Sequence, residues 1–155
     1  MRNYIELTYG NKPWTDYPKK LAEYLAGRYD FYGMEIKGIL KQRPDLRILD
    51  VGCGRGEYLN AFIRMGYHGC GIDQEPYQGR KGHIEQWDIE SGIGNAYRED
   101  SFDVILIKSV IEHLDHPEYT IDECFELLNP GGIIIVMTPD WRQCYNNFYG
   151  DFQHK

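Results

Sequence analysis

Short apolar segments alternate with amphipathic ones through the middle of the chain. The apolar segments have the length and composition of buried parallel strands, and they lie at residues 46–51, 68–73, 83–87, 102–108 and 133–138. Residues 57–65 and 120–128 instead repeat their apolar positions with the spacing of a helix. Strands that alternate with helices predict a parallel sheet with right-handed crossovers. The pattern therefore predicts an α/β fold with a doubly wound sheet.

The segments around this core predict a single domain with three parts. Residues 17–41 have a helical pattern, which Gly27 and Gly33 divide into two shorter helices. We expect a helical cap over residues 1–42, a ligand-binding core over 43–140 and an acceptor-side tail over 141–155. Within the core, 90–101 is predicted to be a loop and "NPGG" at 129–132 a turn.

Composition narrows the class of protein. The net charge is −7, which argues against a nucleic-acid partner, because such a protein needs a basic face. The four cysteines have no C-x-x-C spacing, so we expect buried, reduced thiols in a cytoplasmic protein. The first ten residues lack the apolar core of a signal peptide, and the longest apolar run, 133–137, is too short to cross a bilayer. We therefore expect no membrane partner.

The stretch "LDVGCGRGEYL" at 49–59 places Gly52, Gly54 and Gly56 where a strand hands over to a helix. Glycines there allow unusual backbone angles and a close approach of backbone N–H groups to a ligand. The spacing is G-x-G-x-G, not the G-x-G-x-x-G of a dinucleotide loop. Asp50 precedes the first glycine by two residues. A carboxylate there is a poor neighbour for a pyrophosphate and suits a ligand with an ammonium group.

Asp73 ends the second predicted strand, 23 residues after Asp50. A carboxylate at this position can accept both hydrogen bonds of a ribose diol. The alternative is a local role, in which the side chain caps a helix or closes an Asx-turn. Together with the glycine loop, Asp73 favours the ribose interpretation.

Five stretches resemble, in order and spacing, the motifs of class I S-adenosylmethionine-dependent methyltransferases. They are "ILDVGCGRGEYL", "GCGID", "QWDIE", "FDVILIKSVIEHLDHPE" and "LLNPGGIIIVMTPD", which together cover about residues 43–140. The resemblance implies a Rossmann-like, mostly parallel sheet of about five strands in the order 3-2-1-4-5, with helices on both faces. The cofactor-binding residues that it implies are Asp50, Gly52, Cys53, Gly54, Asp73, Gln74, Trp87, Asp88, Ile89, Lys108 and Ser109.

Within that set the resemblance suggests particular roles. Asp50 would lie near the amino group of the cofactor, Asp73 would bind the ribose hydroxyls, and Asp88 would face the adenine. Lys108 would end the fourth strand beside the methyl group. Arg55 has no fixed role in the family, and we expect it to be solvated.

The resemblance implies an enzyme that transfers a methyl group from S-adenosylmethionine to a small-molecule acceptor and releases S-adenosylhomocysteine. An RNA or protein methyltransferase, a non-catalytic S-adenosylmethionine-binding module and a nicotinamide dehydrogenase are the alternatives. Glu112 and His113 are the candidate catalytic residues, because either could take a proton from the acceptor. They could instead be structural or bind a metal.

The metal alternative comes from two groups of relatives. Ubiquinone-biosynthesis O-methyltransferases and small-RNA 2′-O-methyltransferases have E-x-x-E-H at this position and bind magnesium or a similar ion. This chain has Ser109 in place of the first glutamate, which removes a ligand that hard cations prefer. We therefore expect no metal site. His154 is left out of the candidate site, because the sequence alone cannot place the segment that carries it.

The acceptor pocket of the family lies beside the region after the fifth strand. Asp140, Trp141 and Tyr145 are therefore the candidate acceptor-binding residues, unless this region is only a loop on the sheet edge. The family's sheet has seven strands, and the fifth strand here would be an exposed, apolar edge. We expect the natural chain to continue past Lys155, or a homodimer contact or docked tail to cover that edge.

Overall fold

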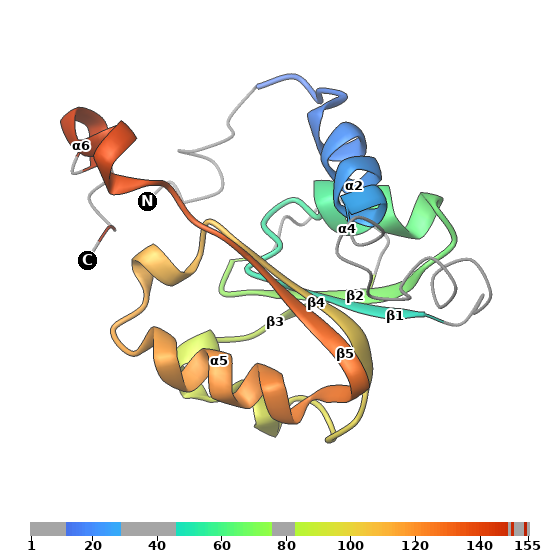
Figure 1. Cartoon of the computed structure of the whole chain (residues 1–155). Coiled ribbons are helices and arrows are strands. Elements are labelled where there is room, and N and C mark those ends of the chain that lie inside the picture. Colours follow the sequence, from blue (N-terminus) through green and yellow to red (C-terminus); the bar gives the residue numbers. More distant parts are fainter. Residues whose placement is uncertain (1–11, 29–45, 76–82, 149, 151–153, 155) are drawn as a thin grey trace.

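The computed structural model describes residues 12–28, 46–75, 83–148, 150 and 154 (Figure 1). The second of the two predicted N-terminal helices lies outside these residues, as does most of residues 1–16. The first is α2, Tyr17–Arg28.

Five parallel strands form one sheet in the order β3-β2-β1-β4-β5. Their bounds are β1 Arg47–Val51, β2 His68–Asp73, β3 Ile84–Gln86, β4 Phe102–Lys108 and β5 Leu128–Met137. Every neighbouring pair in this order is parallel. The α/β class, the five strands and their order are therefore confirmed.

Helices cover both faces of the sheet (Figure 1). On one face lie α2 and α4, Glu57–Arg64; on the other lies α5, Pro117–Glu126. Short 3₁₀ helices follow β3 and β4: η1 Ile89–Ser91, η2 Ile93–Asn95 and η3 Ile111–His113. Helix α6, Trp141–Phe148, lies beyond the carboxyl end of β5.

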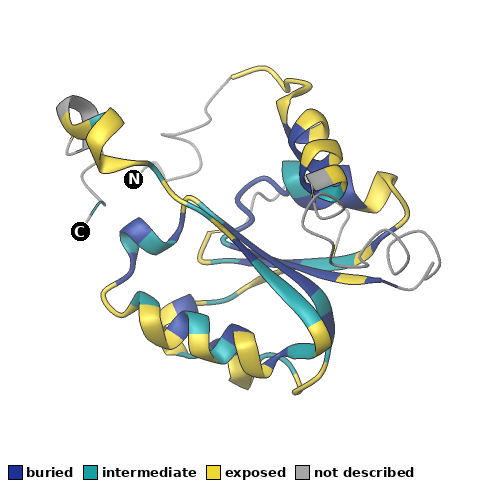
Figure 2. Cartoon of the chain, in the orientation of Figure 1, coloured by how far each residue is buried: buried dark blue, intermediate teal, exposed yellow. Residues whose placement is uncertain are grey.

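The alternation of side chains along the strands builds two separate cores. Ile48, Val104 and Leu106 face the α2 and α4 side and pack with Leu21 and Phe62. Leu49, Ile105 and Ile107 alternate with these residues along the strands. They face the opposite side of the sheet, where they pack with Cys124 of α5 and its neighbours. Figure 2 shows the same division, with buried strands between helices whose outer faces are exposed. Each fully buried Leu or Ile contributes roughly 1.5–3 kcal/mol, so the two cores fix the strand ends that carry the candidate site.

Two local predictions were wrong, and one alternative that the sequence left open is decided. Helix α5 begins at Pro117, not at Thr120. Proline is favoured at the first position of a helix, because the N–H group that it lacks would have no partner within the helix there. "NPGG" does not precede β5 but lies within it, at a shift of register where β5 advances from Leu128 to Ile133 while β4 advances from Phe102 to Val104. The region after β5 forms a helix, not a loop, and Asp140 accepts a hydrogen bond from the Arg142 amide (2.9 Å) at its start.

Strand β5 pairs with β4 on one side and with no other described strand. What covers its outer edge therefore stays a prediction. Among the residues that the structure describes, no helix has the length and apolar character needed to cross a bilayer.

Candidate active site

The candidate site lies where the chain changes direction across the sheet. From β1 the chain builds outward through β2 and β3, and then returns to the other side of β1 as β4. The loops after β1 and β4 therefore diverge at the carboxyl edge, which is where ligands bind in open α/β sheets. The glycine loop follows β1. Lys108 is the last residue of β4, and Ser109 follows it.

The glycine loop needs its glycines for backbone reasons. Gly52, Gly54 and Gly56 have φ values of 68°, 53° and 68°, in the left-handed region that favours glycine. A Cβ on Gly52 would also overlap the Val110 side chain, so the loop lies directly against the segment that follows β4. The amide of Gly52 donates to the Ile72 carbonyl of β2 at 2.8 Å, which holds the loop to the neighbouring strand.

Asp73 joins the glycine loop to the end of β2. Its Oδ2 accepts the Gly54 amide at 2.8 Å, and its Oδ1 accepts the Glu75 amide at 2.9 Å. The second contact is the Asx-turn that was the alternative interpretation of this residue. The first contact places the half-buried carboxylate against the loop backbone. Because each carboxylate oxygen has further acceptor capacity, the local role leaves room for a ribose.

Asp50 is buried, with 2% of its surface exposed, and its Oδ2 accepts the Leu59 amide of α4 at 3.1 Å. The pKa of Asp50 is raised from 3.8 to about 7, chiefly by burial and also by the Asp73 charge, against the opposing effects of the Leu59 hydrogen bond and Lys108. Through this hydrogen bond Asp50 connects the end of β1 to the first turn of α4, next to the glycine loop. A cation in the crevice would favour its ionised form.

The predicted adenine side lies at the ends of β2 and β3. Gln74 donates to Asp88 Oδ1 at 3.1 Å, so the two side chains bridge the two strand ends. Asp88 also caps η1, and the indole of Trp87 donates to the Gly92 carbonyl at 3.1 Å. Ile89 lies in the core, with 4% exposed.

Cys53, also predicted to touch the cofactor, is a buried thiol. Its side chain lies directly under Gly71 of β2, where an added Cβ would come within 2.7 Å of Sγ. Burial raises the pKa of the Cys53 thiol well above its usual range. For Ile89 and Cys53, the backbone is therefore the part best placed to meet a ligand, and their cofactor roles stay predictions.

Lys108 is the last residue of β4, where the family resemblance places the methyl group. Its Nζ lies 3.3 Å from Ser109 Oγ and 4.9 Å from the centroid of the Tyr58 ring on α4. Burial lowers the pKa of Lys108, while Glu112 and Asp50 act in the opposite direction. Ser109 has a φ of 54°, an unfavourable angle for a residue with a side chain. Strain of this kind costs roughly 1–3 kcal/mol and gathers at functional sites.

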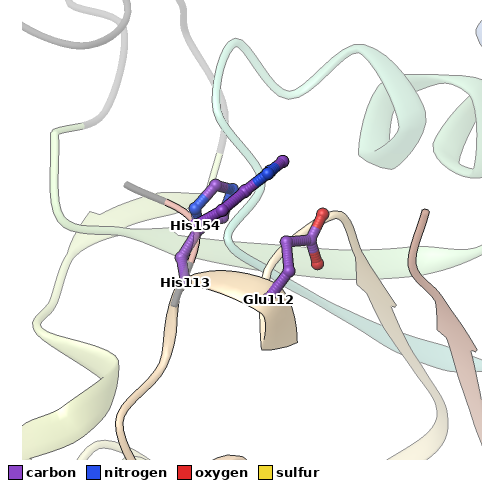
Figure 3. Close-up of side chains that lie close together, drawn as sticks. All are labelled: Glu112, His113 and His154. Atoms are coloured by element: carbon purple, nitrogen blue, oxygen red, sulfur yellow. The ribbon is translucent and has the colours of Figure 1, made fainter. Parts of the chain in front are cut away.

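Glu112, His113 and His154 come together beside this strand end (Figure 3). One ligand atom from each lies within 4.8 Å of the others, and the two imidazole centroids are 4.8 Å apart. Glu112 is 9% exposed, and its Oε2 accepts the Thr138 hydroxyl at 3.1 Å. His154 could not be assigned to this site from the sequence, because the segment that carries it could not be placed; the structure brings it to Glu112 and His113.

One carboxylate and two imidazoles are a donor set that suits a divalent transition metal. Three atoms bound to one such ion at about 2.0–2.2 Å in a tetrahedral arrangement lie roughly 3.3–3.6 Å from one another. Ligand atoms that lie within 4.8 Å of one another would therefore need to approach by roughly 1 Å to share an ion, and their residue types fit one. The expectation of no metal site was made from the loss of the first glutamate at Ser109, with little weight given to His154.

The candidate acceptor residues lie on or next to α6. Trp141 and Tyr145 are exposed, at 55% and 57%, and their ring centroids are 6.2 Å apart. Asp140 starts the helix, as described above. Their position beyond the carboxyl end of β5 is on the same edge of the sheet as the glycine loop, and their role stays a prediction.

Arg55 is not solvated, contrary to the expectation from sequence. It lies in the glycine loop with 7% of its surface exposed and pairs with Glu57 at 2.7 Å. Its guanidinium carbon lies 4.4 Å from the centroid of the Trp14 ring. The sequence held no local signal for the Trp14 contact, because the two residues are 41 positions apart.

A model of a family described as a methyltransferase domain matches residues 17–153. The chain belongs to this family. In the structure of an S-adenosylmethionine-dependent methyltransferase from Archaeoglobus fulgidus, the same fold recurs with a TM-score of 0.70. That alignment covers 99% of this methyltransferase domain and 67% of the other chain, at 23% identity.

Two curated relatives are ubiquinone biosynthesis O-methyltransferases. The Xylella fastidiosa protein is 32% identical in an alignment of 142 positions that covers 77% of this chain and 57% of that protein. The Cereibacter sphaeroides protein is 36% identical in an alignment of 105 positions that covers 60% of this chain and 41% of that protein. The methyltransferase domain thus spans about half the length of these relatives.

Proposed function

We propose that this domain binds S-adenosylmethionine across the carboxyl ends of β1 and β2 and transfers its methyl group to a hydroxyl of a small molecule. The observation that carries the proposal is the contact of Asp73 with the Gly54 amide at 2.8 Å. It places the acid that would bind the ribose beside the loop that would carry the methionine part. Membership of the methyltransferase family supports the reaction, and the O-methyltransferase relatives support an oxygen acceptor.

The charges of the crevice suit a cationic ligand. Asp50 lies under the glycine loop and Asp73 beside it, and both would stabilise the ammonium and sulfonium groups of the cofactor. Lys108 lies at the end of β4, beside the position that the methyl group would occupy. The loop itself has no phosphate-binding role in this account, consistent with its G-x-G-x-G spacing.

Methyl transfer from the sulfonium to an oxygen is an in-line displacement that the cofactor itself makes possible. The protein's largest contribution is alignment of the two reactants, worth up to about 7–11 kcal/mol. His113 accepts the proton of the acceptor hydroxyl, and the adjacent Glu112 stabilises the imidazolium that forms. Asp140, Trp141 and Tyr145 bind the acceptor from the α6 side.

A second version of the site uses a metal ion held by Glu112, His113 and His154. The proximity of these three ligands favours it. A divalent ion would lower the pKa of an acceptor hydroxyl as a Lewis acid. In this version Glu112 and His113 hold the ion and do not act as bases, whereas the roles of Asp50 and Asp73 are unchanged.

The test is transfer of the methyl group from radiolabelled S-adenosylmethionine to a panel of phenols and catechols, with aliphatic amines and an RNA oligonucleotide for comparison. We expect product from the phenolic acceptors. His113→Gln should lower kcat by about 10²–10⁴-fold with little change in cofactor affinity. The control His116→Gln changes an exposed histidine 3.6 Å from a Glu118 carboxylate oxygen and should leave kcat unchanged. Transfer to the oligonucleotide alone would contradict the small-molecule acceptor, and tight cofactor binding without any transfer would identify a binding module.

A further inference from the structure

Arg55 belongs to the glycine loop, but its side chain contacts the segment that precedes α2. Nη1 donates to the Lys12 carbonyl at 3.2 Å, and Nη2 donates to Glu57 Oε1 at 2.7 Å. The guanidinium also lies over the Trp14 ring, with 4.4 Å from its central carbon to the ring centroid. One side chain therefore connects the loop after β1 with residues 43 and 41 positions earlier in the chain.

The surroundings of Arg55 make these contacts specific for arginine. Its side chain is 7% exposed and that of Glu57 is 13% exposed, so the pair is largely shielded from water. A planar guanidinium can stack on an indole face while its edges donate hydrogen bonds, which a lysine ammonium cannot do. Arg55 is therefore held by specific contacts and is not simply a loop residue exposed to solvent.

The contact continues along the face of α2 that covers the sheet. Tyr17 at the start of α2 meets Tyr58 of α4 edge-on, with ring centroids 6.3 Å apart. Tyr58 also contacts Lys108 at the end of β4, whose Nζ lies 4.9 Å from the centroid of its ring. Arg55 and Tyr58 lie three residues apart at the start of α4, so the N-terminal segment is attached to the glycine loop and to the methyl end of the crevice.

We propose that Arg55 is a positioning residue that couples the N-terminal segment and α2, residues 12–28, to the conformation of the glycine loop. A ligand that binds the glycine loop thereby also stabilises residues 12–28 against local opening. By reciprocity, contacts that hold residues 12–28 in place increase affinity for that ligand. The inference rests on the proposed function only in naming the ligand as S-adenosylmethionine.

Hydrogen–deuterium exchange of the amides of α2 tests this coupling, with and without saturating S-adenosylmethionine. In the wild-type protein we expect the ligand to slow exchange in Tyr17–Arg28 by about fivefold or more, a typical coupling between two sites. In Arg55→Met, exchange should be faster without ligand, and saturating ligand should not slow it. The affinity of this variant should fall by a similar factor, while Arg55→Lys should be intermediate.

Lys20→Ala is the matched control. Lys20 lies on α2 in an exposed ion pair with Asp16 at 2.7 Å, so its loss should leave the ligand-induced slowing as in the wild type. Trp14→Leu provides a second route if Arg55→Met does not fold, because it removes the stacked ring and leaves the loop unchanged. It should reproduce the loss of slowing.

Equal ligand-induced slowing of α2 in wild type and in both variants would overturn the coupling, as would no slowing in the wild type despite saturated binding. A protein that does not bind S-adenosylmethionine would contradict the proposed function instead. In that case the exchange rates without ligand still test the role of Arg55. If α2 exchanged at the same rate in Arg55→Met and Trp14→Leu as in the wild type, the coupling would be overturned.

Discussion

The amide of Gly54 donates a hydrogen bond to the carboxylate of Asp73 at 2.8 Å. This contact crosses from the loop after β1 to the end of β2, over 19 positions of the sequence. It means that the backbone expected to lie under the methionine part and the carboxylate expected to bind the ribose are fixed relative to each other before any ligand arrives. The two parts of the predicted site are therefore already in contact before binding, which lowers the cost of ordering them.

Asp73→Asn should weaken S-adenosylmethionine binding by about 10–100-fold, because a hydrogen bond to a charged acceptor is worth roughly 1.5–3 kcal/mol. Titration calorimetry measures the change. Asp122→Asn, an exposed carboxylate on α5, is the control and should bind as the wild type does. Unchanged affinity in a folded Asp73→Asn protein would remove the ribose role from this residue.

Gly52→Ala should destabilise the fold by about 2–4 kcal/mol, because the φ of 68° strains a residue with a side chain and the new methyl group overlaps Val110. Denaturant unfolding measures the loss. Val110→Ala supplies the second arm of a double-mutant cycle, since it removes the overlapping methyl groups. The double variant should be more stable than the sum of the single effects predicts, and additive effects would mean that Val110 does not restrict this glycine.

The part of the fold that follows from side-chain alternation was predictable. The five strands and their approximate bounds can be located from apolar runs, because a strand buried on both faces must be apolar throughout. The start of α5 and the place of "NPGG" could not be predicted in this way. Pro117 reads equally well as a loop residue or as the first residue of a helix, and Gly131, with a φ of 82°, fits a turn as well as an irregular strand.

The residues of the candidate site were likewise predictable only where a local sequence pattern marks them. Asp50, Gly52 and Asp73 could be selected from sequence, because each lies within a few residues of a predicted strand end. His154 and the partner of Arg55 could not. Their contacts join segments 41 residues apart, as for His113 and His154, or join the loop to a segment before the first strand, and no local spacing encodes such distances.

Asp50 should make stability depend on pH. Its pKa is about 7 in the folded protein against 3.8 for an ordinary aspartate, so the folded state keeps a proton that the unfolded state has lost between these values. The free energy of unfolding should therefore fall as the pH rises through this window. Asp50→Asn cannot ionise and should be less sensitive to pH here, and more stable than the wild type at about pH 8.

Thermal unfolding at a series of pH values between about 4 and 8 measures this dependence. The exposed Asp122→Asn variant should keep the wild-type slope. Equal slopes for wild type and Asp50→Asn would mean that the Asp50 carboxylate is ionised throughout, and that its burial does not hold a proton on it.

His154→Gln should weaken binding of Zn²⁺ or Mn²⁺ to the ligand-free protein if these ions occupy the Glu112, His113 and His154 cluster. We expect at least about a tenfold loss, the change caused even by removing an outer-shell partner of a metal site. Calorimetric titration with each metal salt measures it, and His116→Gln is the control outside the cluster. Absence of metal binding in the wild type, or equal affinity in His154→Gln, would leave His113 in the role of base.

The central claim is that a cationic sulfur nucleoside occupies the crevice between the glycine loop and Asp73. Calorimetric titration of the purified chain with S-adenosylmethionine, S-adenosylhomocysteine and NAD tests it most directly. The account predicts one molar equivalent of heat-releasing binding for each of the first two and none for NAD. Binding of NAD, or failure of a folded protein to bind either sulfur nucleoside, would contradict it.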